Sequence, residues 1–344
     1  MSRFRKPSLA AFEPYVPGTQ PADGENWVKL NTNESPFPPA PGVREAVGGA
    51  IDRLPLYPDP AQADFREAVS EALDVAPEMV VGGNGADEVL AMALRAFVPA
   101  GGRAAFLEPS YTLVPKLCSI YEVEGEEHPF APGYGLPQGF VDSTAPLKFL
   151  TNPNSPTGTV QPLDDIAALC RASSGVVLVD EAYVDFAPTS ALEILGEHEN
   201  LLLVRSMSKS YGLAGLRVGF ALGAAALVAD LWAVKDICNL GRLPLAAAAA
   251  AMRDRPYWKS CVDGTIRNRR LLSEELISRG WEVLPSGANF IFAAPPTPAE
   301  EVFERLRRKR VLVRHFPRPS IRHALRISIG TTEECRALLT ALEE

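Results

Sequence analysis

From about residue 60 onward, segments with helical periodicity alternate with short apolar runs. The helical segments are residues 64–73, 86–97, 163–171 and 298–309, the last of which begins on a proline that a first helical turn tolerates. The short apolar runs predict strands at residues 79–81, 104–107, 147–150, 176–179 and 201–204. Apolar strands that alternate with helices favour a mostly parallel sheet covered on both faces. We therefore predict an α/β fold whose ligands bind outside the carboxyl ends of the strands.

The two ends of the chain follow other patterns. The first ~45 residues are rich in Pro and Gly and have little periodicity, which predicts an extended arm. The C-terminal part reads as a long helix, then strand, helix, strand, strand and a last helix, at residues 253–279, 289–293, 298–309, 311–314, 324–329 and from Thr332. We predict three parts: an arm of residues 1–45 that forms part of the small domain, a large domain of residues 46–245, and a small α+β domain of residues 246–344.

Composition and charge exclude several classes of function. The chain has 344 residues and a formal net charge of −8, whereas nucleic-acid binding needs a basic surface. No apolar run reaches the ~18 residues that span a bilayer, and the N-terminus does not read as a signal peptide. The five cysteines are scattered without a C-x-x-C pair, so neither a metal site nor disulfides are expected. A reducing, cytoplasmic location fits best.

Small residues at 82–85 separate a predicted strand from the helix predicted to begin at Ala86. Such residues let backbone N–H groups approach a ligand, and a helix N-terminus favours an anion such as phosphate. An ordinary tight turn is the alternative. Residues 149–158 form a second loop at a strand end, in which Pro153 and Pro156 restrict the backbone. We expect Asn152 to be held there as a side-chain donor, with plain turn chemistry as the alternative.

The strand at residues 176–179 runs directly into Asp180. A carboxylate buried there needs a cationic partner, and a protonated pyridine nitrogen would supply one. Such a charged ring acts as an electron sink for a carbanion. Metal ligation by Asp180 and Glu181 is the competing interpretation, but no His or Asp cluster nearby supports it.

The strand at residues 201–204 leads into small polar residues and Lys209. A lysine at a strand end would face the crevice, where it can be a nucleophile toward an aldehyde. Ser206, Ser208 and Arg217 are suited to hold a phosphate. A solvated surface charge is the alternative for Lys209.

These four segments, in this order, resemble the fold-type I pyridoxal phosphate enzymes of the aspartate aminotransferase superfamily over residues 29–330. The chain is more closely similar to histidinol-phosphate aminotransferases, on the segments 14–15, 29–36, 57–59, 85–88, 180–186 and 325–331. The resemblance implies pyridoxal 5′-phosphate as cofactor. It also implies a large domain with a mostly parallel seven-stranded sheet and a smaller α+β domain.

The resemblance implies roles for individual residues. Lys209 forms the internal aldimine and later moves the proton between Cα and the cofactor, and Asp180 pairs with the pyridine nitrogen. Asn152 and Tyr183 hydrogen-bond the phenolic oxygen of the ring, on which Tyr111 stacks. The phosphate group is held by the backbone at Ala86 and Asp87 together with Ser206, Ser208 and Arg217.

The resemblance also implies a homodimer, because Tyr57 reaches the phosphate of the neighbouring subunit's cofactor. Arg326 binds the anionic group of the substrate, Asn33 belongs to the substrate site, and Arg314 and Tyr15 close over it. For Arg314, one more charge in the basic stretch 305–326 is the alternative.

The function implied is amino transfer between histidinol phosphate and 2-oxoglutarate in histidine biosynthesis, with a small-molecule amino donor and keto acceptor. The chain has Asn-Glu-Ser-Pro at residues 33–36 where the family often has Asn-Glu-Asn-Pro, which leaves the substrate open. An aromatic aminotransferase, a threonine-phosphate decarboxylase-like enzyme and a catalytically idle protein of the same fold remain alternatives. A nucleotide-binding enzyme would need a Gly-rich motif that residues 82–85 do not match.

Overall fold

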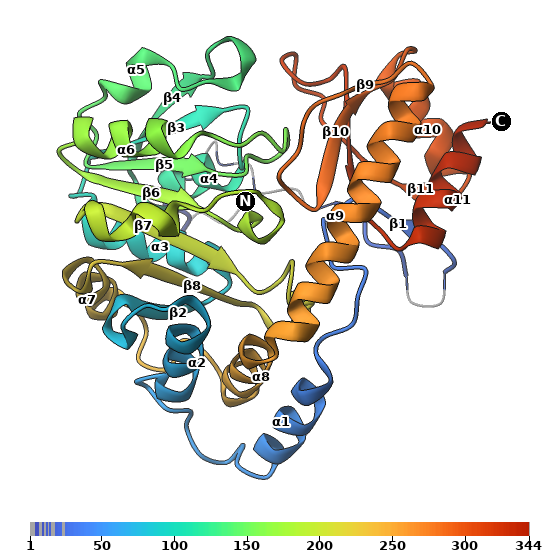
Figure 1. Ribbon diagram of the computed structural model, residues 1–344. Helices are drawn as coiled ribbons and strands as arrows, with labels where there is room; N and C mark the ends of the chain where they lie inside the picture. Colours follow the sequence, from blue (N-terminus) through green and yellow to red (C-terminus); the bar gives the residue numbers. More distant parts are fainter. Residues whose placement is uncertain are drawn as a thin grey trace.

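The computed structural model describes residues 4–6, 9, 12, 14, 18–22 and 25–343, so Tyr15 lies outside the described residues. Figure 1 shows a large lobe built around one sheet and a small lobe built around another, with helix α9 (Arg255–Ser278) running between them. Arg269 on α9 donates to the carbonyl oxygens of Phe186 in the large lobe, at 3.1 Å, and of Ala288 in the small lobe, at 2.7 Å. Because α9 contacts both lobes, the predicted boundary at residues 245/246 stays a prediction.

The sheet of the large lobe has seven strands, as predicted, and is mostly parallel. Only β8 runs antiparallel to its neighbours, β2 and β7. The strand order is β2 (Val80–Asn84), β8 (Val218–Gly223), β7 (Leu201–Ser206), β6 (Val176–Asp180), β5 (Leu147–Thr151), β3 (Arg103–Glu108) and β4 (Glu124–Pro129).

The alternation of side chains along the strands builds two hydrophobic cores, one on each face of the sheet. Val177 and Val179 pack into one core and Leu178 into the other. The first core is covered by α1 (Pro41–Ile51), α2 (Ala63–Leu73), α5 (Gln138–Val141), α6 (Leu163–Ala172) and α8 (Arg242–Arg253). The second is covered by α3 (Ala86–Phe97), α4 (Leu113–Tyr121) and α7 (Ala225–Val234).

The small lobe contains a four-stranded antiparallel sheet and two helices. The strand order is β12 (Arg314–His315), β13 (Leu325–Ser328), β10 (Phe290–Ala294) and β9 (Glu282–Val283), and the helices are α10 (Ala299–Arg308) and α11 (Thr332–Glu343). The arm joins this lobe: β1 (Val28–Lys29) pairs in parallel with β11 (Val311–Leu312), and Leu30 is buried in the small-lobe core.

Three predictions about local structure are wrong in detail. Residues 311–314 form two short strands in different sheets, because β11 pairs with the arm while β12 pairs with β13. Residues 82–84 are not a turn, since β2 extends to Asn84 and pairs with β8 over its whole length. Pro298 is the N-cap of α10 and not part of its first turn.

One edge of the large sheet gathers the polar ends of several strands. Thr151 is opposite Asp180 across β5 and β6, and Ser206 is opposite Gly219 across β7 and β8. Since β8 is antiparallel, its first residues lie at the same edge as the last residues of the parallel strands. Among the residues described, no helix is both long and apolar enough to cross a membrane.

Candidate active site

A pocket lies at this edge of the sheet, where the arm and the small lobe meet the large lobe. Its walls come from arm residues 31–33, from the ends of the sheet strands, and from small-lobe residues 314–326. It brings together most of the predicted site residues: Asn33, Ala86, Asp87, Tyr111, Asp180, Tyr183, Ser206, Ser208, Lys209, Arg217, Arg314 and Arg326.

Two predicted site residues lie outside this pocket. Asn152 is buried behind it, and its carboxamide oxygen accepts a hydrogen bond from the Gln161 N–H at 2.7 Å, so that its NH₂ group is the part left to serve as a donor. Tyr57 is 87% exposed, and its carbonyl oxygen accepts from Arg242. The role of Tyr57 in a neighbouring subunit stays a prediction.

Lys209 is half-buried in the turn after β7 and faces the pocket, so it is not a solvated surface charge. Its Nζ donates to the Thr32 carbonyl oxygen at 3.3 Å and lies 5.6 Å from the centre of the Tyr183 ring. Glu34 is a nearby anion. Burial would raise the pKa of its carboxyl group, but hydrogen bonds from Lys29 and Thr32 hold that pKa below its ordinary value. The lysine amine therefore sits among oxygen acceptors.

Asp180 ends β6 and is 6% exposed. Burial raises the pKa of its carboxyl group to about 7, against a lowering effect of the hydrogen bond that Oδ1 accepts from the Ala182 N–H at 3.0 Å. The charges of Asp87 and Glu181 raise this pKa further, and that of Lys209 lowers it. Such a carboxylate is stabilised by a cation that enters the pocket.

Glu181, the next residue, does not line the pocket and is paired inside the large lobe. Its carboxylate lies 3.0 Å from Arg205 Nη2 and accepts from the Ser190 hydroxyl and the Ala191 N–H. The pair leaves Glu181 no role as a metal ligand beside Asp180. Among the residues described, no group of three His, Cys, Asp or Glu side chains could hold a metal ion.

The N-terminus of α3 and Arg217 lie together at one end of the pocket, where the sequence predicts an anion. The Arg217 guanidinium lies 3.1 Å from the Asp87 carboxylate and donates to Ser208 Oγ at 3.3 Å. Tyr111 donates to the other oxygen of Asp87 at 2.9 Å. Arg217 itself has a φ of 53°, a backbone conformation that costs a non-glycine residue ~1 kcal/mol or more. The backbone at Arg217 therefore adopts an unfavourable conformation, and the guanidinium lies beside the N-terminus of α3.

Two glycines are required at this end of the pocket. Gly85 has a φ of 80°, and a Cβ there would lie 2.6 Å from Arg217 Nη2. A Cβ on Gly219 would lie 2.3 Å from the backbone nitrogen of Ala86. A side chain at either position would displace the helix N-terminus or the arginine. Close packing of β8 on the start of α3 therefore depends on these glycines, and anion binding at this segment stays a prediction.

A second cationic end comes from the small lobe. Arg314 and Arg326 are opposite each other on β12 and β13, and their guanidinium groups lie 5.5 Å and 5.4 Å from the centre of the Phe316 ring. Arg326 donates to Ser155 Oγ at 3.1 Å and to the Asn31 carbonyl oxygen at 2.9 Å. The pocket therefore has cations from both lobes.

Asn33 connects the arm with both lobes. Its Nδ2 donates to Tyr183 Oη at 3.1 Å, and its N–H donates to Ser328 Oγ at 2.8 Å. Asn289 donates to its carbonyl oxygen at 3.0 Å. Asn33 therefore contacts the pocket through its hydrogen bond to the Tyr183 phenol.

Sequence reasoning missed several residues that line the pocket, among them Ser155 and Arg318. Ser155 lies in the recognised proline-rich loop, and its contact with Arg326 depends on how the small lobe docks. Arg318, within the basic stretch, lines the pocket and pairs with Glu108 at the end of β3 at 2.7 Å. No local pattern distinguishes Arg318 from its neighbours.

Comparison with known proteins agrees with this geometry. Residues 25–342 match the family described as aminotransferase class I and II. The chain belongs to this family. Among curated relatives, a histidinol-phosphate aminotransferase of Geobacter sulfurreducens is 41% identical over 355 residues, which cover 100% of this chain and 99% of the relative. One from Bradyrhizobium diazoefficiens is 42% identical over 349 residues, with 100% and 99% covered.

Solved structures share the fold of this chain. A histidinol-phosphate aminotransferase from Sinorhizobium meliloti, in complex with pyridoxal-5′-phosphate, superposes with a TM-score of 0.90 at 26% identity and covers 99% of this aminotransferase and 97% of that chain. An aspartate aminotransferase mutant from Thermus thermophilus has a TM-score of 0.80 at 22% identity, with 99% of each chain covered. The second likeness concerns the fold alone.

Proposed function

We propose that this aminotransferase uses pyridoxal 5′-phosphate to exchange an amino group between histidinol phosphate and 2-oxoglutarate, a step of histidine biosynthesis. The names of the full-length relatives at 41% and 42% identity support this substrate pair. One observation carries the proposal: a single pocket joins the Lys209 amine and the buried Asp180 carboxylate with cations from both lobes.

The residues present fit the cofactor. The Asp180 carboxylate, whose pKa burial raises to about 7, would be stabilised by a pyridinium nitrogen. The start of α3, Ser208 and Arg217 would hold a phosphate, since a helix N-terminus and a guanidinium both favour one. Tyr111, which also lines the pocket, is the aromatic side chain predicted to stack on the ring.

When bound, pyridoxal phosphate supplies an aldehyde that takes up the amino group and a pyridinium ring that accepts electron density from the adjacent carbon. Lys209 Nζ would take the proton from the carbon that bears the amino group of the amino substrate. In the second half of the reaction it would return a proton to the corresponding carbon of the keto substrate. Asp180 would hold the proton on the ring nitrogen. Asn33 would orient the Tyr183 hydroxyl through the hydrogen bond of 3.1 Å.

Arg314 and Arg326 would bind the anionic end of each substrate. A phosphate and the side-chain carboxylate of glutamate each present at least two acceptor oxygens that a guanidinium can bind through two N–H groups. Both substrates carry an anion at the end remote from the reacting amine. One pair of arginines therefore serves both halves of the reaction.

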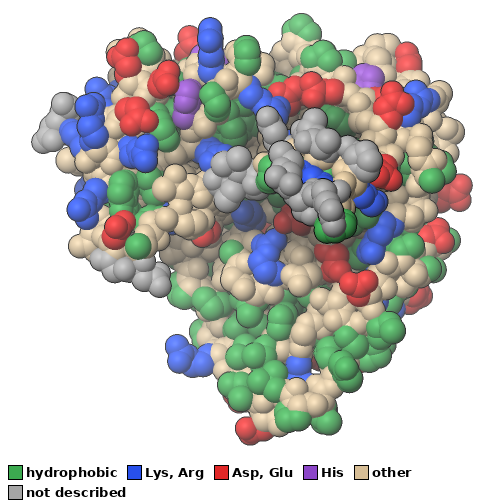
Figure 2. All heavy atoms as spheres, turned by 180° about the vertical axis from the view of Figure 1, so that it is seen from behind, with side chains coloured by type: hydrophobic (Ala, Val, Ile, Leu, Met, Phe, Trp, Pro, Cys, Tyr) green, Lys and Arg blue, Asp and Glu red, His purple; other side chains and the backbone are tan. Residues whose placement is uncertain are grey.

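We also propose that the active unit is a homodimer to which each subunit contributes Tyr57. Tyr57 is 87% exposed and follows Ile51, Leu54 and Leu56, which are 49%, 54% and 60% exposed. Figure 2 shows hydrophobic side chains gathered over the lower part of the molecule, where α1, α2 and α8 lie in Figure 1. A second copy would cover such a surface.

Mixing two variants tests the dimer. Lys209→Ala subunits combined with Tyr57→Ala subunits should regain activity, because one of the two sites in the mixed dimer would have both residues. A monomer in sedimentation, or no gain on mixing and refolding, would contradict it.

Two measurements test the reaction. The protein with added pyridoxal phosphate should show a visible band that borohydride abolishes, with the pyridoxyl label on Lys209, and Lys209→Ala should lose activity by about 10³-fold or more. Amino transfer from glutamate should favour imidazole-acetol phosphate over phenylpyruvate. No band would refute the cofactor. A preference for phenylpyruvate, or decarboxylation of threonine phosphate, would refute the substrate assignment.

A further inference from the structure

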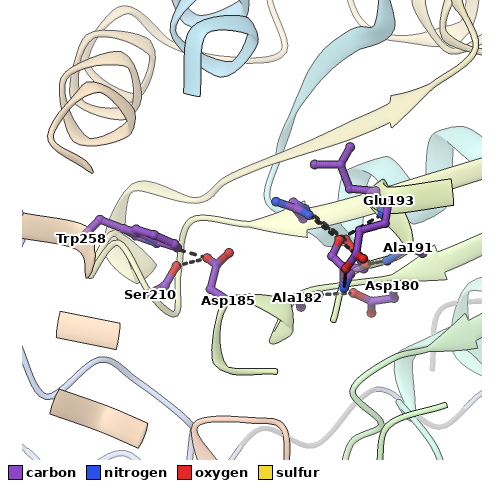
Figure 3. Close-up of polar contacts among 11 residues, drawn as sticks. Asp180, Ala182, Asp185, Ala191, Glu193, Ser210 and Trp258 are labelled. Atoms are coloured by element: carbon purple, nitrogen blue, oxygen red, sulfur yellow. Dashed lines mark hydrogen bonds and ion pairs between the residues drawn. The ribbon is translucent and has the colours of Figure 1, made fainter. Parts of the chain in front are cut away.

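The carboxylate of Asp185 lies directly behind the lysine turn and accepts hydrogen bonds from two other elements (Figure 3). Ser210, the residue after Lys209, donates its hydroxyl to Asp185 Oδ2, and Trp258 Nε1 donates to the same oxygen at 3.4 Å. Ser210 is 5% exposed. A buried hydroxyl bound to a carboxylate makes a charge-assisted hydrogen bond, which is stronger than a neutral one.

Asp185 belongs to the short helix that begins directly after Tyr183, the phenol beside Lys209. Helix η4 (Val184–Phe186) follows directly after Tyr183, whose ring centre lies 5.6 Å from Lys209 Nζ. Asp185 comes two residues later. The bond from Ser210 to Asp185 therefore ties the backbone beside Lys209 to the helix that follows Tyr183. The amine and the phenol are held by one local connection.

The start of α9 holds the other side of the lysine turn. Trp258 stacks on Tyr211, with ring centres 6.1 Å apart and an interplanar angle of 26°. Arg255 lies 3.8 Å from the centre of the Trp258 ring and donates to Tyr211 Oη at 2.9 Å. Residues 210 and 211 are thus fixed by η4 and by α9, and Asp185 is the acceptor that the two sides share.

We propose that Asp185 is a positioning residue for the reaction. Asp185 acts on Lys209 through the hydroxyl of Ser210. A lysine amine on a flexible four-carbon stem reaches a defined place only if its backbone is fixed. Misplacement of a reacting group by 1 Å can lower a rate by about 10²-fold. The inference rests on the proposed function, because it assigns a task to residues around the amine that moves the proton.

The test uses Ser210→Ala, Asp185→Ala and the double variant in the full-length protein with bound pyridoxal phosphate. We expect each single variant to lower kcat about tenfold or more while KM for glutamate changes by less than about twofold. We also expect the pH midpoint of the cofactor's visible band to shift by about half a unit or more, because that midpoint reports where the lysine nitrogen lies relative to its neighbours. The double variant should be no worse than Asp185→Ala alone, since both single substitutions remove the bond between Ser210 and Asp185 and only Asp185→Ala also removes the contact with Trp258.

Two further variants separate positioning from general stability. Asp185→Asn keeps an acceptor oxygen and should recover part of kcat and of the band midpoint. Ser143→Ala is the matched control, because it removes a serine–carboxylate hydrogen bond of 2.6 Å to Glu126, and neither residue lines the pocket. This variant should change neither kcat nor the band midpoint.

The inference is overturned if Ser210→Ala and Asp185→Ala lower only the melting temperature, as Ser143→Ala would, or if their losses in kcat multiply in the double variant. A change confined to KM also overturns it. Failure of the proposed function is a different result, because the wild-type protein would then lack the visible band and the transfer activity.

Discussion

Asn33 Nδ2 and Tyr183 Oη lie 3.1 Å apart, in a hydrogen bond that joins the arm to the turn after β6. Asn33 is the donor, so the phenol oxygen is oriented by a residue 150 positions away in the chain. The pocket is therefore complete only when the arm is in place.

Asn33→Ala should lower kcat/KM by up to about tenfold and Tyr183→Phe by at least as much, because both remove the hydrogen bond between these residues and Tyr183→Phe also removes the hydroxyl predicted to contact the cofactor. Steady-state kinetics with glutamate and imidazole-acetol phosphate would measure it. A loss in Asn33→Ala alone would mean that the arm matters through its contacts with Ser328 and Asn289 and not through the phenol.

Asp180→Asn should stabilise the protein without cofactor at pH 8. The pKa of Asp180 rises from 3.8 to about 7 on folding, so the folded state binds the extra proton and the free energy of unfolding falls as pH rises through this window. At pH 8 the raised pKa lowers the free energy of unfolding of the wild type by up to about 4 kcal/mol. The neutral amide of the variant does not carry this cost.

Urea unfolding of Asp180→Asn and wild type at pH 5 and pH 8 would measure this difference. The advantage of the variant should shrink at pH 5. In wild type at pH 8, added pyridoxal phosphate should restore stability, and it should do so less in the variant. Equal stability of the two proteins at pH 8 would contradict the raised pKa.

Arg217→Gln should weaken pyridoxal phosphate binding about tenfold to a hundredfold, because a charge-assisted contact with the phosphate is lost. Arg253→Gln is a matched control: it breaks an ion pair of 2.7 Å with Asp64 at the surface, away from the pocket, and should leave the affinity unchanged. Titration of the visible band with cofactor gives both constants. Equal effects of the two substitutions would remove Arg217 from the phosphate site.

Arg326→Lys should raise KM for histidinol phosphate about tenfold or more and leave the visible band unchanged, because lysine cannot reproduce a two-point contact with the anion. Arg322→Lys, an exposed change on the same segment, should have no effect. If KM rises equally for histidinol, which lacks the remote anion, Arg326 acts by orienting Ser155 and the Asn31 backbone and not by binding the phosphate.

Local patterns predicted those parts of the fold that local energetics determine. The helix predicted at residues 86–97 matches α3, because an apolar stripe and the preceding glycine define its face and its start. β4, with the sequence EGEEHP, was missed because it is a polar edge strand whose pairing with β3 supplies its order. α8 was missed because its run of alanines has no polar face to mark a period.

The pocket was predictable where chemistry and sequence position coincide. Asp180 and Lys209 follow buried strands, and parallel strands bring such residues to one edge. Ser155 and Arg318 could not be predicted in the same way, since their partners, Arg326 and Glu108, are far away in the sequence and meet them only through the docking of the two lobes. The strand predicted at residues 311–314 is divided for another reason: its first half pairs with β1 of the arm and its second half with β13.

The antiparallel direction of β8 has a consequence for the order of folding. Because β7 and β8 form a hairpin, with Ser206 opposite Gly219, the lysine and Arg217 sit in one connection of the chain. Contacts close in sequence form sooner than those between Asn33 and Ser328, which are 295 positions apart. In pulse-labelled hydrogen exchange we expect amides of β7 and β8 to gain protection before that of Asn33, and the reverse order would contradict this. Lys209 would then be reachable by an aldehyde while the arm is still undocked.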